Sequence, residues 1–205
     1  MGLWQTWKKT VLEPERFWSS VEPGGTSSDA LYYGWLLTVV GSVPTTLVNL
    51  VNFKSLQAQF QQLTSKMNDV PTEFGKALDT VAAHSGAFAI GLGVFSIVIY
   101  PVSLLIGAAV VHLGCLMFGA GRNGFGATLR VVAYASAPAA LAWIPMVGFA
   151  AAIYALVLEV WGIARVQDTS AGRAIGGVLA LPLLLGCCAC GLAFAAAVAV
   201  VGAMR

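Results

Sequence analysis

Charged side chains are scarce in this sequence. Asp, Glu, Lys and Arg make up 10% of its 205 residues, whereas 58% of the residues are hydrophobic and the mean hydropathy is +0.81. An ordinary soluble domain is about 25% charged. The composition therefore excludes a soluble globular domain and predicts an integral membrane protein.

Signatures of catalysis and of nucleic-acid binding are also missing. The chain contains no H-E-x-x-H, G-x-S-x-G or Walker sequence, and nothing assembles a nucleophile with a base. Residues 119–124 fit G-x-G-x-x-G, but they follow an apolar run where a nucleotide-binding fold needs a strand. The net charge of +2 is spread over both sides of the membrane and offers no basic face. We therefore expect no enzymatic activity, no cofactor, no metal and no nucleic-acid partner.

The four cysteines do not indicate a disulfide framework or a metal site. Cys115, Cys187, Cys188 and Cys190 all fall in apolar runs, where oxidising enzymes and soluble metals have no easy access. A metal site would need Cys187 and Cys190 to meet Cys115 or His112 from another helix. Because a buried cysteine more commonly behaves as a small hydrophobic residue, we interpret all four as packing residues.

The long apolar runs predict an all-α protein with five transmembrane helices. A span needs roughly 20 residues to cross the hydrocarbon core, and lipid cannot satisfy open backbone groups, so each run must be helical. A closed barrel would need alternating strands of roughly ten residues, which this sequence lacks. The spans are expected at about residues 30–52, 87–118, 127–143, 147–164 and 174–203.

Two of these runs, 87–118 and 174–203, are longer than the membrane is thick. As one helix, the first would be about 48 Å long against about 30 Å of hydrocarbon. We expect both to be single helices that tilt or kink, the first at Pro101. Their small residues favour close helix contact, within one chain or in a homo-oligomer.

Lys and Arg predict an orientation with the N-terminus inside and the C-terminus outside. In that orientation the inner segments carry seven of these residues and the outer segments four. The first 29 residues are polar and mixed in charge, so we expect no cleavable secretion signal, and the first span must direct insertion. A multi-pass protein of the cell inner membrane, surrounded by membrane lipids, is predicted.

Residues 1–29 are predicted to form a cytoplasmic segment with a helix in the membrane interface, ahead of a membrane domain at 30–205. Tryptophan prefers the headgroup zone and lysine the anionic inner surface. The apolar residues at helical spacing are Leu3, Trp4, Trp7 and Val11, with Lys8 and Lys9 between them and a restart at Pro14. We expect this helix to lie along the cytoplasmic face.

Residues 53–86, between the first two spans, predict two short amphipathic helices on the outer side. The apolar stripes are Leu56, Phe60, Leu63 and Met67 in the first helix and Phe74, Leu78 and Val81 in the second. Pro71 stands where the second helix would start. We expect both helices to pack on the bundle, with a lid or partner surface as the alternative.

A stripe of polar residues follows one face of the first span. Its members are Thr38, Ser42, Thr45 or Thr46, and Asn49. Pro44 interrupts the backbone ladder among them. Such a stripe faces protein or water, so interhelical hydrogen bonding is the favoured interpretation and the wall of a polar pathway is the alternative.

Arg130 lies inside an apolar run, where an ionisable side chain is by default paired, lining water or functional. Around the predicted outer turn, Arg130 lies about 23 Å back along its helix and Glu159 about 20 Å forward along the next. Around the inner turn, the depths of His112 and Arg130 differ by only about 3 Å. These three groups are therefore expected in one layer below the cytoplasmic surface, with Tyr134 one turn deeper.

The expected reason for Arg130 is thus a contact with Glu159, with His112 near enough to share the site. In the alternative, Arg130 extends to lipid phosphate and His112 donates to a backbone carbonyl. A buried pair of this kind often serves only structural specificity rather than catalysis or transport.

Several stretches resemble the Yip family, the Ypt-interacting membrane proteins. The family pattern runs from a glycine-rich turn through a Tyr and Pro helix to an I-P-x-x-G turn. The matching stretches are "GRNGFGATLRVVAYASAPAALAWIPMVG" and "IYALVLEVWGIARVQDTSAGRAI", and "GAAVVHLGCLMFG" and "VLEPERFW" are similar to the small bacterial members. The resemblance places the family's turn positions on Gly121, Gly124, Tyr134, Pro138, Pro145 and Gly148, with His112 and Arg130 flanking the inner turn.

The resemblance implies a fold more firmly than an activity. Eukaryotic relatives are implicated in Rab GTPase binding and early secretory traffic, a role that relies on a long cytoplasmic N-terminal region. The corresponding region here has only about 29 residues.

Two hypotheses for the function follow. In the first, the protein is a non-enzymatic membrane organiser or scaffold that binds another membrane protein or a second copy. In the second, it is a small transporter, channel or lipid-translocating protein that uses the polar stripe and the His112, Arg130 and Glu159 layer. Glu159 separates the two, since a scaffold needs it only as a static partner of Arg130, whereas a transporter needs it to titrate or exchange partners.

Overall fold

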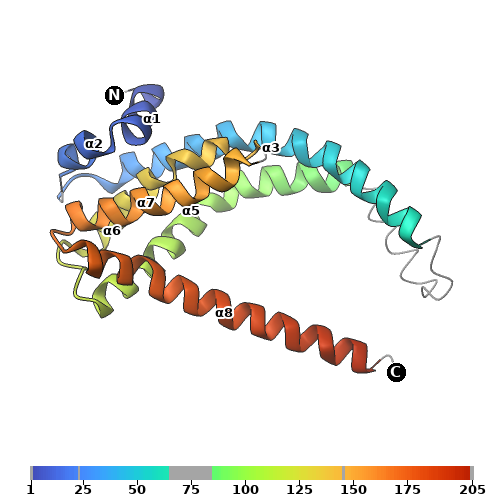
Figure 1. The fold of residues 1–205 in the computed structure, drawn as a ribbon. Helices are drawn as coiled ribbons and strands as arrows, with labels where there is room; N and C mark the ends of the chain where they lie inside the picture. Colours follow the sequence, from blue (N-terminus) through green and yellow to red (C-terminus); the bar gives the residue numbers. More distant parts are fainter. Residues whose placement is uncertain (1, 23, 65–84, 145, 204–205) are drawn as a thin grey trace.

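The computed structural model describes residues 2–22, 24–64, 85–144 and 146–203, and all regular secondary structure within them is helical. The prediction of an all-α protein is therefore confirmed for this part of the chain (Figure 1). The elements are α1 Leu3–Leu12, α2 Pro14–Ser20, α3 Ser27–Thr64, α5 Ser85–Met117, α6 Gly124–Ala135, the 3-10 helix η1 Ala137–Leu141, α7 Val147–Val166 and α8 Ala171–Ala203.

Four helices of the described chain are long and apolar enough to cross a membrane. Their apolar segments are Ser27–Asn52 in α3, Ile90–Met117 in α5, Val147–Val166 in α7 and Ala171–Ala196 in α8. The expectation that 87–118 and 174–203 form single helices is confirmed, because α5 and α8 each run unbroken for 33 residues. Each is about 50 Å long, which exceeds the hydrocarbon thickness of about 30 Å.

The third expected span, at 127–143, does not form one helix. α6 ends at Ala135, and after Ser136 the chain continues as η1, which has Pro138 near its start. Proline has no backbone N–H and disfavours helical geometry at the residue before it, so the α-helical ladder stops there. The prediction of a continuous helix over 127–143 is wrong, and this segment is not among the four long apolar helices.

The prediction of a separate short helix at the start of 53–86 is also wrong, because α3 continues without a break to Thr64. Residues 49–64 contain neither glycine nor proline, so nothing in the sequence ends the helix at the membrane boundary. α3 is thus about 57 Å long. Met67, the last residue of the first stripe, and the second expected helix, with Pro71, Phe74, Leu78 and Val81, lie outside the described residues.

The long helices pack most closely near the turn between α5 and α6. There α5 crosses α8 at Gly114 and Gly177, and beyond the crossing the two helices diverge (Figure 1). A Cβ atom at Gly114 would overlap the backbone carbonyl of Gly177, and one at Gly177 would lie 2.8 Å from Sγ of Cys115. The crossing therefore depends on two residues without side chains, as is common between membrane helices.

Past this crossing, none of the other described helices covers α8. Every residue from Pro182 to Ala196 is exposed, including Leu183, Leu192 and Phe194. The three cysteines of this segment, Cys187, Cys188 and Cys190, are exposed and free, whereas Cys115 is buried at the crossing. The interpretation as packing residues is thus confirmed for Cys115 alone.

The N-terminal segment, for which one interfacial helix is expected, forms two helices, α1 and α2, with a break at Glu13, and both contact the core. Phe17 and Trp18 are 7% and 2% exposed. Trp7 Nε1 donates to the carbonyl of Ala137 in η1 at 2.9 Å, and the Tyr154 hydroxyl of α7 donates to the carbonyl of Val11 at 2.6 Å. The segment is therefore attached to the membrane domain by buried side chains and hydrogen bonds.

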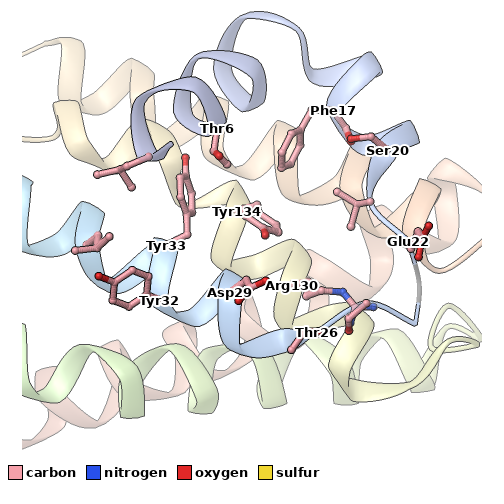
Figure 2. Close-up of a pocket in the computed structure, with 14 residues that line it drawn as sticks. Thr6, Phe17, Ser20, Glu22, Thr26, Asp29, Tyr32, Tyr33, Arg130 and Tyr134 are labelled. Atoms are coloured by element: carbon pink, nitrogen blue, oxygen red, sulfur yellow. The ribbon is translucent and has the colours of Figure 1, made fainter. Parts of the chain in front are cut away.

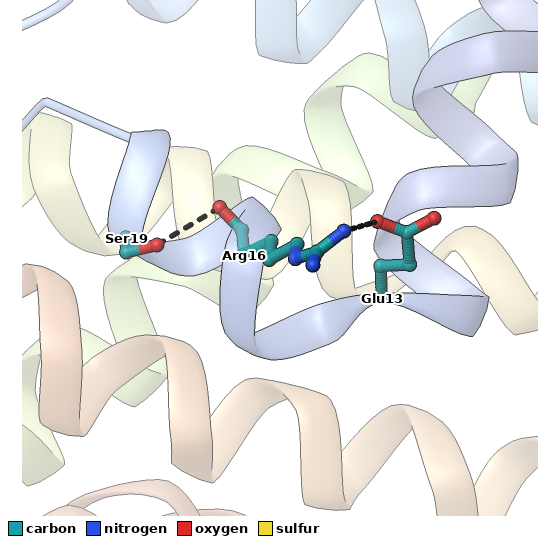
Figure 3. A network of polar contacts seen from close by, with 3 residues as sticks. All are labelled: Glu13, Arg16 and Ser19. Atoms are coloured by element: carbon teal, nitrogen blue, oxygen red, sulfur yellow. Dashed lines mark hydrogen bonds and ion pairs between the residues drawn. The ribbon is translucent and has the colours of Figure 1, made fainter.

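Polar contacts on the exposed surface of α2 contribute much less to the stability of this attachment. Arg16 Nη1 lies 3.3 Å from Oε2 of Glu13, and Ser19 Oγ donates to the Arg16 carbonyl at 3.0 Å (Figure 3). The Arg16 side chain is 86% exposed, and exposed ion pairs contribute about 0–1 kcal/mol. Burial of Trp18 dominates, since truncating a buried aromatic residue costs about 3–5 kcal/mol.

Candidate functional site

The ionisable residues expected in one layer lie in three different environments. Arg130 is 4% exposed, and its Nη1 donates to the backbone carbonyl of Gly25, just before α3. Oε1 of Glu159 is buried and has no hydrogen-bond partner among the described residues, while its carboxylate lies within electrostatic range of Cys115 on α5. The expected contact between Arg130 and Glu159 is therefore not formed.

His112 belongs to a polar network that the sequence analysis missed. Its Nδ1 lies 2.9 Å from Oγ1 of Thr128 on α6, and the same Oγ1 accepts a hydrogen bond of 2.9 Å from Nε2 of Gln167. Gln167, which is fully buried, also donates to the Gly124 carbonyl at 3.0 Å and accepts from the Asn123 amide at 2.6 Å. We call His112, Asn123, Thr128 and Gln167 the inner-turn network.

The inner-turn network fixes the turn between α5 and α6 to the end of α7. Asn123 adds a hydrogen bond of 2.7 Å from Nδ2 to the Val166 carbonyl, and Gly124 has a φ of +76°, which favours glycine. A glutamine at the end of a helix ordinarily faces water, so nothing in the sequence marked Gln167 as buried.

Tyr134 shares a cavity with Arg130, on the same side of α6. Its ring packs edge-on against Phe17 of α2, with centroids 5.1 Å apart, and lies 5.2 Å from the ring of Tyr33. The expectation that Tyr134 lies on the same face as Arg130 is consistent with this shared lining.

The cavity beside Arg130 is enclosed by α1, α2, the linker to α3, the first turns of α3, and α6 (Figure 2). Its volume is about 540 Å³, and we call it the N-terminal cavity. Phe17, Tyr33 and Arg130 form a buried floor, and the exposed lining residues form a rim. The rim residues are Ser20, Glu22, Thr26, Asp29 and Tyr32. This is a pocket with a buried cation at its base and two carboxylates at its mouth.

The polar stripe of the first span lines a second, smaller cavity of about 260 Å³ between α3, α5 and η1. The members that line it are Thr38, Ser42 and Thr45, together with Ser96, Tyr100 and Ser136 from the other elements. Thr46 instead lies against Gly93 of α5, and the side chain of Asn49 lies outside the described part.

The stripe hydroxyls donate within their own helix rather than between helices. Thr38, Ser42 and Thr45 donate to carbonyls three or four residues earlier in α3, at 3.1, 2.8 and 2.7 Å. Interhelical hydrogen bonds near this level run from the Tyr100 hydroxyl of α5 to Oγ of Ser136, at 3.2 Å, and from Trp35 Nε1 of α3 to the Ile97 carbonyl of α5, at 3.1 Å. Interhelical bonding by the stripe's own hydroxyl donors, the favoured interpretation, is therefore wrong for these three residues.

The remaining family turn positions occupy tight sites in the structure. A Cβ atom at Gly148 would lie 2.5 Å from the Ala142 carbonyl oxygen, and one at Gly121 would lie 2.8 Å from Cδ2 of Leu116. Pro138 is the second residue of η1, and Pro145 lies outside the described residues. Both glycines therefore allow close approach of neighbouring chain segments.

Comparison with protein families gives a match over most of the chain. The family model described as the Yip1 domain matches residues 8–199, which include the second cavity, the inner-turn network, most of α8 and the lining of the N-terminal cavity except Leu3 and Thr6. No curated protein and no solved structure matches the chain.

Proposed function

Because the chain belongs to the Yip1 domain family, we propose that it is a non-enzymatic membrane scaffold that binds a second copy of itself along α8. Family members interact with membranes and with Rab- and Ypt-related proteins. The observation that carries the proposal is the exposed half of α8, from Pro182 to Ala196, which leaves the bundle beyond the crossing with α5 (Figure 1).

The exposed half of α8 has one face suited to close helix packing. Gly186, Ala189, Cys190 and Ala193 share that face, since they follow helical spacing. Small residues let membrane helices approach closely, and the chain already uses this device where α5 meets α8. A second copy presents the same face, so a two-fold pair buries Gly186 of both chains.

Disulfide trapping in native membranes tests this pairing. Single-cysteine variants that keep Cys190, Cys187 or Cys188 present the thiol at increasing angles from the Gly186 face. We expect the oxidised dimer to be strongest with Cys190 and weakest with Cys188. Equal trapping at all three positions, or none, contradicts the proposal.

Matched substitutions sharpen the same experiment. Gly186→Leu is expected to abolish the Cys190 dimer, because the new side chain separates the two helices. Gly191→Leu is the control, since both glycines have nothing within 4 Å of their Cβ position but Gly191 lies on another side of α8. If both variants lower trapping equally, the Gly186 face is not the interface.

We also propose five passes through the membrane, with the N-terminus inside and the C-terminus outside. α6 and η1 together rise about 28 Å, close to the hydrocarbon thickness of about 30 Å, and they run antiparallel to α7 (Figure 1). An epitope fused after Arg205 should therefore be cleaved by protease added outside intact cells. Protection of that epitope contradicts the orientation.

One observation favours the alternative of a transport protein: Oε1 of Glu159 is buried and has no hydrogen-bond partner in the described part of the chain. For the scaffold, we expect Glu159→Gln to leave the unfolding temperature unchanged or higher, because the substitution breaks no hydrogen bond of Oε1 within the described residues and removes a charge that is costly to bury. We also expect no flux of protons, ions or fluorescent lipid in proteoliposomes of either protein. Flux in the wild type that disappears in a folded Glu159→Gln variant would establish transport instead.

A further inference from the structure

We propose that the N-terminal cavity binds the headgroup of a phospholipid that carries a primary ammonium group, such as phosphatidylethanolamine. This site is separate from the α8 surface and does not depend on the scaffold role. The proposal rests on the volume, position and charge distribution of the cavity.

The N-terminal cavity extends from the end of the membrane span into its depth. Thr26 precedes the first residue of α3, and Leu36 lies about 14 Å further along that helix. The cavity therefore reaches from the level of the headgroups to the level of the acyl chains. A volume of about 540 Å³ is in the ordinary range of small-molecule sites, roughly 300–1,000 Å³.

The lining changes from polar to apolar along this direction. Glu22, Thr26 and Arg130 lie at one end of the cavity and Tyr32 and Tyr33 at the other (Figure 2). Leu3 of α1 and Leu36 of α3 also belong to the lining. A lipid fits this gradient, because its phosphate can lie at the polar end and its acyl chains at the apolar end. A free phosphate makes no contact with the apolar end.

Arg130 is the group that would hold the phosphate. A guanidinium has five N–H donors in a planar fork, so Arg130 can keep the contacts that it makes within the chain, the bond to the Gly25 carbonyl among them, and still donate to phosphate oxygens. Its burial on the cavity floor strengthens charge-assisted hydrogen bonds. The Tyr33 hydroxyl, on a residue 5% exposed, lies beside Thr10 of α1 and adds a second buried polar group to the cavity floor.

The rim of the cavity determines which charged group the ligand can carry beyond its phosphate. Asp29 and Glu22 place two carboxylates at the mouth, outside the single cation on the floor. A primary ammonium can donate to both carboxylates, whereas a quaternary ammonium has no N–H to donate. The terminal glycerol of phosphatidylglycerol is uncharged, so it offers the rim carboxylates neutral hydroxyl donors and no charge-assisted hydrogen bond. A phosphate inside and an ammonium outside match the order of charges in phosphatidylethanolamine.

Native mass spectrometry of the purified full chain, titrated with lipids of identical acyl chains, tests the site. We expect phosphatidylethanolamine to bind roughly tenfold more tightly than phosphatidylglycerol or phosphatidylcholine, as one charge-assisted hydrogen bond gives. The combined rim variant Glu22→Gln, Asp29→Asn should lose this preference. The control is Glu15→Gln, since Glu15 is exposed on α2 outside the cavity.

A second variant tests the floor. Arg130→Lys keeps the charge but not the fork, and we expect it to weaken binding of all three phospholipids while thermal unfolding confirms the fold. The exposed rim variants keep the test decisive if Arg130→Lys does not fold. Equal binding of the three lipids, or an unchanged preference in the rim variant, overturns the proposal. If glycerophosphoethanolamine displaces bound phosphatidylethanolamine at equal concentration, the ligand is a soluble phosphate ester of the same chemistry and not a lipid.

Discussion

Replacement of Gln167 by leucine is expected to lower the free energy of unfolding by about 3 kcal/mol, because a buried polar group left without its partner costs about 1–3 kcal/mol. The substitution removes the acceptor of the Asn123 amide and the donor to the Gly124 carbonyl and Thr128 Oγ1. Gln167 is fully buried, so water does not replace these hydrogen bonds. Steric trapping or reversible unfolding in detergent measures the loss.

Two neighbouring variants show whether the network is the cause. Gln167→Glu keeps an acceptor for the Asn123 backbone amide but loses both donors. We therefore expect it to lower the free energy of unfolding clearly more than Asp168→Asn does. Asp168→Asn changes an exposed side chain one residue later and should change stability by less than about 0.5 kcal/mol. A Gln167→Leu protein as stable as Asp168→Asn would show that the inner-turn network does not hold α7 to the turn.

Replacement of Gly114 by valine is expected to have an equal or larger effect, at least about 3 kcal/mol, the upper end of the usual cost of overpacking. The Cβ atom at this position overlaps the Gly177 carbonyl, and a backbone carbonyl cannot rotate away as a side chain can. α5 and α8 must therefore separate at their crossing. The unfolding temperature in detergent and protease sensitivity of α8 both report this separation.

Gly107→Val is the matched control for Gly114→Val. Gly107 lies seven residues earlier on α5, near the same face, and nothing lies within 4 Å of its Cβ position. The same change in side chain therefore tests the site rather than the residue type. Equal losses in the two variants would mean that valine weakens α5 itself and that the crossing is not the cause.

Hydropathy predicts the helices whose ends lie at the membrane boundary. It does not predict where a proline ends a helix. α7 was expected at 147–164 and forms at Val147–Val166. Pro44, Pro101 and Pro182 all remain inside continuous helices, whereas Pro138 follows the end of α6 and lies in the first turn of a 3-10 helix. A membrane helix can accommodate proline through its neighbours, so the sequence alone does not distinguish a kink from a break.

The helical rise gives an expected depth for a side chain but says nothing about the direction in which it points. Arg130 and Glu159 were expected at one level, yet Arg130 faces the N-terminal cavity and Glu159 lies near Cys115. Packing of α6 against α3 and α7 decides which way each side chain points, and that packing depends on residues distant in sequence. Trp18 illustrates the same limit, because an interfacial tryptophan and a core tryptophan have the same local sequence pattern.

The attachment of α1 and α2 to the core also sets an order of events during synthesis. Val11 and Tyr154, which share a hydrogen bond, are 143 residues apart in the chain. At a translation rate of about 5–20 residues per second, roughly 7 to 30 s pass between the appearance of the two partners. Throughout that interval Phe17 and Trp18 have no α7 to pack against, so the first helices made are among the last to reach their final places.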